Sequence, residues 1–345
     1  MGDWLEVDGS YGEGGGQIIR SSVSLAAITG KAVHIQNIRA KRAKPGLQNQ
    51  HLTAVRAGAE ICAAEMRGDA VGSTELFFRP TKKVEAAHYR FDITTAGAST
   101  LVLQTVLTPL ALAGGASHVT VTGGTHNPMA PPAEYLEFVY LPALARAGLK
   151  SIMDSPRNGF YPKGGGQIRL SLSLESGFMP VDFTLRGDLL RASGIVLASN
   201  LPETVLERGE ATLREFLPES VPVERRLKPS PGVGAAAFAH TEFEGGFGGF
   251  ISLGEKGKPM EKVAEECGSA FEKWMQADAA VDEHLADQLV LPMALAKGRS
   301  RWRTIEVTEH LRTVLWLVGL FVPAAMEIEE LGDGSGIVVI EGCGT

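Results

Sequence analysis

Segments with the pattern of strands alternate with segments with the pattern of helices along most of the chain, and this alternation limits the possible folds more than any other feature. Residues 4–7 and 32–38 have the pattern of strands, whereas residues 17–28 carry apolar side chains at the spacing of a helix. Alternating strands and helices build sheets that are covered by helices. The sequence therefore predicts an α/β protein.

The same patterns continue to the end of the chain. Helices are predicted over residues 50–66, 100–113, 133–147, 203–216, 256–275, 285–296 and 311–320, and strands over residues 118–122, 194–198, 236–240, 249–253, 302–307 and 336–341. Gly148 is expected to end the helix over residues 133–147, and Pro142 to kink it. Charged amphipathic helices and glycine-rich loops set residues 185–277 apart. We expect these residues to form a small α/β domain, inserted into a large domain of residues 1–184 and 278–345.

The charge and the cysteine content exclude several classes of protein. The chain of 345 residues carries 33 Lys and Arg against 40 Asp and Glu, a net charge of −7, so it has no general basic coat for nucleic acid. The three cysteines are widely spaced and indicate neither a disulfide framework nor a zinc knuckle. The longest apolar run, residues 314–326, is too short to span a bilayer, and no signal-peptide pattern is visible. We expect a cytoplasmic protein without a membrane partner.

A glycine-rich string occurs twice. The pattern Tyr-x-x-Gly-Gly-Gly-Gln-Ile begins at Tyr11 and again at Tyr161. The two copies are either duplicated structural turns, or at least one of them faces a ligand. Glu13 in the first copy stands where the second has Lys163, so we do not expect the same role for both. A carboxylate on such a turn is a candidate ligand for a divalent cation, although an ordinary turn residue would look the same.

A short basic segment is the densest polar cluster in this acidic chain. Four of the six residues from 39 to 44 are Arg or Lys. Arginine binds phosphate with two hydrogen bonds, and the helix predicted to start near Gln50 and His51 adds a positive end. Arg20, on the first predicted helix, could join this patch. The alternative is a solvated surface loop.

His310 lies between the strand predicted over residues 302–307 and the helix predicted over residues 311–320. A neutral imidazole is a competent nucleophile at pH 7, but a histidine that caps or packs a helix is equally compatible with this position. His284 begins another helix, and Asp287 and Gln288 follow one turn later, where they could bind a base or a ribose. The sequence contains neither a P-loop motif nor a dinucleotide-binding glycine motif in its strand-to-helix setting.

Taken together, these strings resemble the RNA 3′-terminal phosphate cyclase family. The resemblance spans nearly the whole chain and is carried by residues 9–20, 37–51, 123–132, 159–167 and 284–294, together with His310. It implies a large domain of repeated units, each with a four-stranded sheet and two helices, plus a smaller inserted α/β domain. It also implies that ATP and a divalent metal, magnesium or manganese, convert an RNA 3′-phosphate to a 2′,3′-cyclic phosphate. AMP would be carried first by a histidine and then by the RNA, with release of pyrophosphate and finally AMP.

The resemblance assigns roles to individual residues. His310 matches the adenylated histidine, and Glu13 matches the metal-coordinating glutamate. The residues that match the phosphate and RNA pocket are Arg20, Arg39, Arg42, Gln50 and His51. The residues that match ATP contacts are Gln104, Pro131, Phe250, His284, Leu285, Ala286, Asp287 and Gln288.

Two positions depart from the family pattern. Many members have Tyr where this chain has His284, and some have Asn where it has Val314. Any group that orients the His310 imidazole must therefore come from elsewhere. Two other kinds of protein share features with this pattern: the non-catalytic cyclase-like proteins of ribosome assembly, which lack the adenylated histidine, and the enolpyruvyl transferases, which also use repeated α/β units. The presence of His310 argues against the first, and the basic segment together with the histidine motif argues against the second.

Overall fold

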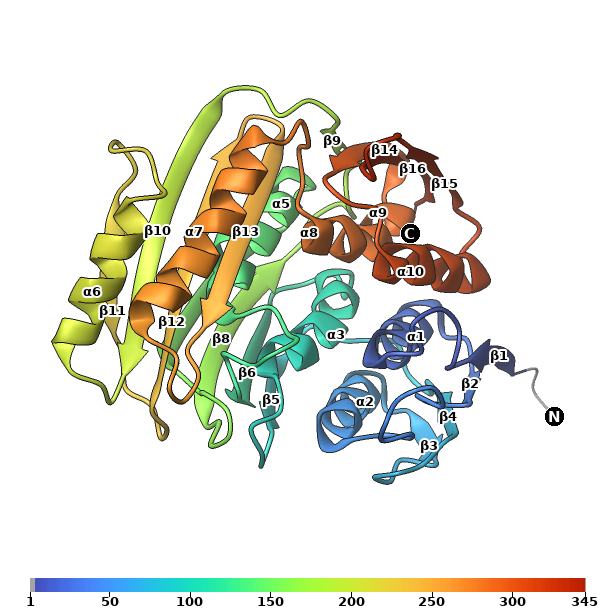
Figure 1. Cartoon of the computed structure of the whole chain (residues 1–345). Helices are drawn as coiled ribbons and strands as arrows, with labels where there is room; N and C mark the ends of the chain where they lie inside the picture. Colours follow the sequence, from blue (N-terminus) through green and yellow to red (C-terminus); the bar gives the residue numbers. More distant parts are fainter. Residues whose placement is uncertain (1–3, 345) are drawn as a thin grey trace.

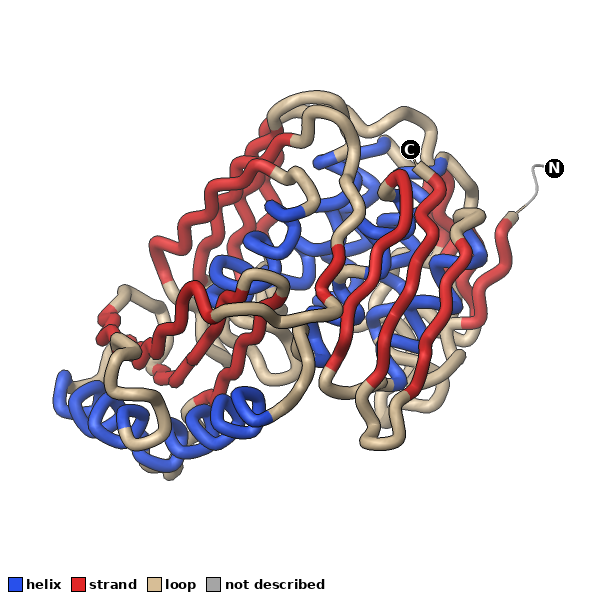
Figure 2. Tube along the Cα trace, turned by 90° about the horizontal axis from the view of Figure 1, so that it is seen from above, coloured by secondary structure: helices blue, strands red, loops and turns tan. Residues whose placement is uncertain are grey.

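The computed structural model describes residues 4–344, which form four four-stranded sheets. Three units repeat one order of elements: strand, helix, strand, helix, strand, strand. In each of them the first two strands pair parallel and the other pairs are antiparallel. Figures 1 and 2 show the sheets at the outer edges of these units and their helices packed against one another between them. This confirms the predicted α/β class with repeated four-stranded units.

The elements of the first two units follow one another without interruption. The first unit contains β1 (Leu5–Asp8), α1 (Gly16–Thr29), β2 (Val33–Gln36), α2 (Asn49–Cys62), β3 (Glu65–Arg67) and β4 (Leu76–Arg79), in sheet order β1-β2-β4-β3. The second contains β5 (His88–Asp92), α3 (Ser99–Ala111), β6 (Ser117–Gly123), α4 (Ala133–Tyr135), η1 (Leu136–Tyr140), α5 (Leu141–Arg146), β7 (Lys150–Arg157) and β8 (Gly166–Ser173), in order β5-β6-β8-β7.

The third unit is interrupted by the fourth sheet. It contains β9 (Asp182–Phe183), α8 (Glu283–Gln288), α9 (Val290–Leu295), β14 (Lys297–Thr304), α10 (Glu309–Phe321), β15 (Ala325–Glu330) and β16 (Gly336–Cys343), in order β15-β16-β14-β9. The inserted unit contains β10 (Leu189–Ser199), α6 (Glu203–Arg214), β11 (Val223–Leu227), β12 (Gly234–Phe243), β13 (Gly246–Leu253) and α7 (Met260–Gln276), in order β11-β10-β12-β13. Figure 1 shows it as the sheet and two helices farthest from β1.

The chain segments before and after the inserted unit pair with the same edge of β14. β9 pairs parallel with Arg301 and Trp302, and after the inserted unit Val281 forms a parallel bridge with Thr304, two residues farther along β14. The chain therefore leaves the sheet and returns to the same edge. The division into domains at residues 185 and 277 stays a prediction, but this unit does enclose an apolar cluster of its own between its sheet and helices α6 and α7.

Local sequence explains where the helices of the site begin and end. Apolar residues from Ile18 to Ala26 recur at helical spacing on α1 and are buried, and Gly30 ends the helix in the left-handed conformation with φ of 72°. The hydroxyl of Thr308 accepts a hydrogen bond from Leu311 N at the start of α10. These helices place Gln17, Arg20 and His310 within their first two turns.

Several predicted boundaries need correction. The helix predicted over residues 50–66 ends at Cys62, because Ala63 is left-handed with φ of 47° and the chain turns into β3. The segment 285–296 forms two short helices, α8 and α9, and the strand predicted over 302–307 ends at Thr304. Pro142 does not simply kink a helix over residues 133–147: it lies in the first turn of α5, after the π-helical turn η1, where a proline removes no needed donor. Strands β3, β4, β5, β7, β8, β9, β11 and β15 were not predicted.

The described residues contain no helix that is both long enough and apolar enough to cross a membrane.

Candidate active site

A cleft of about 890 Å³ lies where helices of the three repeated units meet β13 of the inserted unit. It is lined by thirteen of the residues singled out in the sequence: Glu13, Arg20, Arg39, Arg42, Gln50, His51, Gln104, Pro131, Phe250, His284, Asp287, Gln288 and His310. The other two, Leu285 and Ala286, are fully buried in the core and are not among the lining residues. Residues far apart in the chain therefore meet in one place.

His310 lies between two side chains, one from the first glycine turn and one from the start of α1. Its Nδ1 lies 2.9 Å from Gln17 Oε1, and its Nε2 lies 3.2 Å from Glu13 Oε2. An amide oxygen can only accept a hydrogen bond, so Nδ1 carries the proton and the lone pair of the neutral ring is on Nε2. Gln17 was not among the predicted site residues. It supplies the orienting contact that Val314, being apolar, cannot provide.

The electrostatic surroundings keep the His310 ring neutral. Burial lowers the pKa of His310 below its ordinary 6.5, the positive charges of Arg20 and Arg42 lower it further, and Glu13 opposes them. Arg42 also holds Glu13, with Nη2 3.1 Å from Oε2. A neutral imidazole with its Nε2 lone pair in a cleft is chemically a nucleophile or a base.

The residues predicted to bind phosphate include arginines and one uncharged histidine. Gln48 N donates to His51 Nδ1 at 3.1 Å, which leaves the proton of the neutral ring on Nε2. Burial lowers the pKa of His51 to about 3, and Arg20 and Arg39 add to this effect. Burial also lowers the pKa of Arg20, to about 10, although Asp287 opposes it. His51 therefore offers a hydrogen-bond donor and no charge, while Arg20 and Arg42 supply the positive charge.

Arg39 has a second task within the basic segment. Its Nη1 donates to the carbonyl oxygens of Lys44 and Gly46, at 2.5 and 3.1 Å, and its φ is 54°. Lys41 and Lys44 do not line the cleft. Part of this basic segment therefore shapes the loop rather than the ligand site.

The opposite part of the cleft offers amide groups without partners. Gln104 Nε2, Gln288 Oε1 and Asn127 Oδ1 are buried and have no hydrogen-bond partner within the described residues. A buried polar atom without a partner costs free energy, so these groups fit a ligand with polar edges, such as a nucleoside. Asp287 lies beside them, and burial raises the pKa of its carboxyl to about 7.

Asp282 ties three elements together beneath this region and was not predicted. Its Oδ1 accepts from Tyr135 Oη at 2.7 Å and from two amides at the start of α8, and its Oδ2 accepts from Gly249 N at 3.0 Å. It therefore links α4, α8 and β13. An Asp immediately before a helical segment is an N-cap signal, which could have identified it from the sequence.

The donor set around Glu13 suits a metal shared with a substrate. Among residues 4–344 no group of three or more His, Cys, Asp or Glu side chains could hold an ion by itself. Magnesium is commonly bound by one or two carboxylates together with substrate phosphates. Glu13, beside the arginines of the phosphate pocket, fits that arrangement.

The two glycine strings occupy different places in the fold. The first connects β1 to α1 and lines the cleft with Glu13, Gly15 and Gly16. The second connects β7 to β8 and is not part of the lining; a Cβ on Gly164 would meet Ala96, and one on Gly165 would meet Pro231 of the inserted unit. The first copy therefore faces the cleft, and the second packs against neighbouring chain.

Comparisons with known proteins agree on one family. A family model described as RNA 3′-terminal phosphate cyclase matches residues 11–328. A protein of that name from Methylococcus capsulatus is 44% identical, over 98% of this chain and 96% of the relative. Proteins of the same name from Trichormus variabilis and Pyrobaculum neutrophilum are 46% and 41% identical, over 90% and 99% of this chain and 91% and 99% of the relatives.

Among solved structures, the enolpyruvyl transferase NikO from Streptomyces tendae matches 98% of this chain with a TM-score of 0.40 and 12% identity. This chain covers 48% of that protein.

Proposed function

Because the chain belongs to the RNA 3′-terminal phosphate cyclase family, we propose that it is an enzyme that uses ATP to convert an RNA 3′-phosphate end to a 2′,3′-cyclic phosphate. The observation that carries this proposal is the His310 site. A neutral imidazole presents its Nε2 lone pair to a cleft that also contains arginines and unpartnered amides.

In the first step, Nε2 of His310 attacks the α-phosphorus of ATP. A nitrogen–phosphorus bond forms, and the bond to the bridging oxygen breaks, so pyrophosphate leaves with the electron pair. Nδ1 keeps its proton throughout and donates it in a hydrogen bond to Gln17 Oε1. The positive charge that develops on the ring lies next to Glu13 Oε2. The lowered pKa of His310 means that the ring is already neutral at pH 7.

In the second step, an oxygen of the RNA 3′-phosphate attacks the phosphorus of the histidine-bound AMP, and the nitrogen–phosphorus bond breaks. The neighbouring 2′-hydroxyl then attacks the 3′-phosphorus, loses its proton and displaces AMP. The last step joins groups on one ribose, so it needs mainly correct positioning. Arg20, Arg42 and His51 line the cleft, and the two guanidinium groups and the Nε2–H of His51 would bind the phosphate and stabilise the charge that develops on it.

Five of the predicted residues would contact the nucleotide. Gln104 Nε2 and Gln288 Oε1 would satisfy their hydrogen bonds with its polar edges, and Pro131, Phe250 and His284 supply apolar and aromatic surface. Glu13 would hold a divalent metal, magnesium or manganese, together with the phosphates of ATP, and such a metal would supply charge that neutralises those phosphates.

Label transfer tests the proposal directly. The protein is incubated with α-labelled ATP and Mg²⁺ or Mn²⁺, denatured, and examined for an adduct that is acid-labile and alkali-stable. Wild type and the matched control His284→Ala should carry label, and His310→Ala should carry none. The label should then pass to RNA with a 3′-phosphate and not to RNA with a 3′-hydroxyl.

An absence of label with either metal would remove His310 from its role and favour the non-catalytic RNA-binding alternative.

A further inference from the structure

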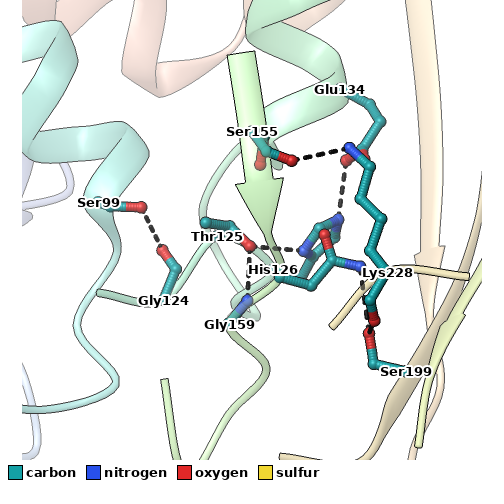
Figure 3. Close-up of polar contacts among 10 residues, drawn as sticks. Ser99, Gly124, Thr125, His126, Glu134, Ser155, Gly159, Ser199 and Lys228 are labelled. Carbon is teal, nitrogen blue, oxygen red and sulfur yellow. Dashed lines mark hydrogen bonds and ion pairs between the residues drawn. The ribbon is translucent and has the colours of Figure 1, made fainter. Parts of the chain in front are cut away.

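A buried polar network lies at the base of the loop 127–132, all six residues of which line the cleft (Figure 3). The loop is closed by a hydrogen bond of 3.1 Å from Ala133 N to Thr125 O. Directly flanking it, His126 Nε2 lies 2.8 Å from Glu134 Oε2, and each of these residues is 1% exposed. The first residue of the loop, Asn127, also donates through Nδ2 to Ala96 O. The loop is therefore fastened at both of its ends.

In the His126–Glu134 pair, the Glu134 carboxylate is ionised. Burial alone would raise the pKa of Glu134, but His126 and Lys228 outweigh it and hold that pKa well below its usual range. A buried carboxylate of this kind becomes costly when its partner is removed. The pair is therefore a fixed contact, and its removal would destabilise the neighbouring loop.

Lys228 extends the fastening to the inserted unit. Its Nζ donates to Ser155 O of β7 at 3.0 Å, and its carbonyl oxygen accepts from Ser199 Oγ of β10 at 2.7 Å. Asn158, which follows β7, donates through Nδ2 to Ser199 Oγ at 3.3 Å and through N to Pro229 O at 2.9 Å. Figure 3 shows Lys228 and Ser199 of the inserted unit beside His126, Glu134 and Ser155 of the second unit.

The loop itself adopts a conformation that needs such support. Met129 has φ of 63°, which residues other than glycine and asparagine rarely adopt, and its side chain is 95% exposed at the cleft. Strained backbone of this kind persists only when the surrounding structure fixes it. Within this loop, the fixing contacts are those at its base.

Thr125, His126 and Glu134 resemble a nucleophile–base–acid arrangement, but the burial of Thr125 excludes that role. Thr125 Oγ1 lies 2.8 Å from His126 Nδ1, yet Thr125 is 1% exposed and its hydroxyl oxygen accepts from Gly159 N at 2.8 Å. A substrate has no access to it. The network acts on the loop rather than on a substrate.

We propose that His126 and Glu134 are positioning residues, whose buried pair fixes the loop 127–132 as a wall of the nucleotide part of the cleft, with Lys228 tying the inserted unit to the same fastening. The identity of the ligand, ATP, rests on the proposed function. The position of the wall does not.

Variants of the His126–Glu134 pair test whether it positions the loop 127–132. His126→Phe keeps a ring stacked on Phe160, and Glu134→Gln keeps the size and one acceptor. His240→Phe is the matched control: it is also a buried histidine stacked on a phenylalanine, Phe138, and it lies outside the network and the cleft lining. In enzyme adenylation, both network variants should raise the KM for ATP about tenfold with little change in the maximal rate, and His240→Phe should leave that KM unchanged.

A double-mutant cycle gives a readout that general destabilisation would not move. Pro131→Ala alters the wall itself, so its effect on the KM for ATP should not multiply with that of Glu134→Gln, because both act through the same loop. Shifts that multiply, or a fall in the maximal rate with an unchanged KM, would overturn the proposal.

Hydrogen–deuterium exchange without any ligand distinguishes this proposal from the proposed function. The peptide covering residues 124–135 should exchange faster in Glu134→Gln than in wild type, and at the wild-type rate in His240→Phe. If exchange behaves in this way while wild type takes no label from ATP, the fastening stands and the proposed function fails. Unchanged exchange in Glu134→Gln refutes the fastening whatever the activity.

Discussion

Replacing Gln17 by Ala should slow adenylation of His310 without removing the nucleophile. The hydrogen bond from His310 Nδ1 to Gln17 Oε1 is 2.9 Å long, and such a bond contributes about 1 kcal/mol net, or about fivefold in rate. Its loss has a second effect. The free ring can move its proton to Nε2 and donate to Glu13 Oε2, 3.2 Å away, which occupies the attacking lone pair. We therefore expect a fall of at least about fivefold.

The assay is a single-turnover measurement of enzyme–AMP formation at saturating α-labelled ATP, across a pH series. Ser21→Ala is the matched control, because Ser21 lies one turn farther along α1 and lines the same cleft. The rate in wild type should rise with pH and then reach a plateau. The pKa of His310 is lowered below 6.5, so the ring becomes protonated, and loses its attacking lone pair, only below that pH.

Gln17→Glu separates orientation from charge. It keeps an acceptor for Nδ1–H but adds a negative charge, which favours the protonated ring, so the midpoint of the pH profile should move upward while the plateau stays near that of wild type. A Gln17→Ala rate equal to that of Ser21→Ala would refute the orienting role. A downward shift of the midpoint in Gln17→Glu would refute the electrostatic argument.

Three further predictions concern the rest of the cleft. Burial raises the pKa of Asp287 from 3.8 to about 7, so between these two pH values the folded protein binds a proton that the unfolded chain has lost, and stability falls as the pH rises from 3.8 to about 7. In urea unfolding, Asp287→Asn, whose side chain stays neutral, should lose less stability than wild type over this pH range. In Gly16→Ala the new Cβ would lie 2.4 Å from His51 Nε2, so the KM for 3′-phosphorylated RNA should rise, whereas the adjacent Gly15→Ala, whose Cβ would meet only Arg42 Nη2 at 3.4 Å, should change it less. His284→Tyr adds stacking surface, so the KM for ATP should fall severalfold, and a KM equal to or above that of wild type would contradict stacking at this position.

The sequence predicts the long helices of the fold and misses eight strands, which range from the two residues of β9 to the eight residues of β7 and β8. Helices such as α1 and α10 carry enough apolar residues at helical spacing to be recognised alone. Strands β3 and β9 have three and two residues, too few to show a period, and only pairing with β4 and β14 defines them. The π-helical turn before Pro142 has no sequence signal that separates it from a kinked helix.

In the candidate site too, some residues were assigned from the sequence and others only from the structure. Family resemblance assigned His310 and Glu13 roles, and the structure brings them within 3.2 Å of each other. Gln17 stood inside a recognised string but was not assigned a role, because no local pattern tells which side chain of a glycine turn faces a residue 293 positions away. His51 was expected in a basic pocket, and only its burial and its contact with Gln48 N show that it is uncharged.

The arrangement of helices explains how an acidic chain can form a pocket for phosphates. Five helices, α1, α2, α3, α8 and α10, place residues of their first turns in the lining of the cleft: Gly16 and Gln17, Gln50 and His51, Leu101, Glu283 and His284, and His310. Unpaired amides and the helix dipole make the start of each longer helix attractive to anions. In all three repeated units the first helix, α1, α3 or α8, contributes residues to this lining. The inserted unit lies in the chain between β9 and α8 of the third unit, and its strand β13 also lines the cleft. The net charge of −7 is therefore no obstacle to binding a polyanion, since the local field is set by helix ends, Arg20 and Arg42 rather than by the whole surface.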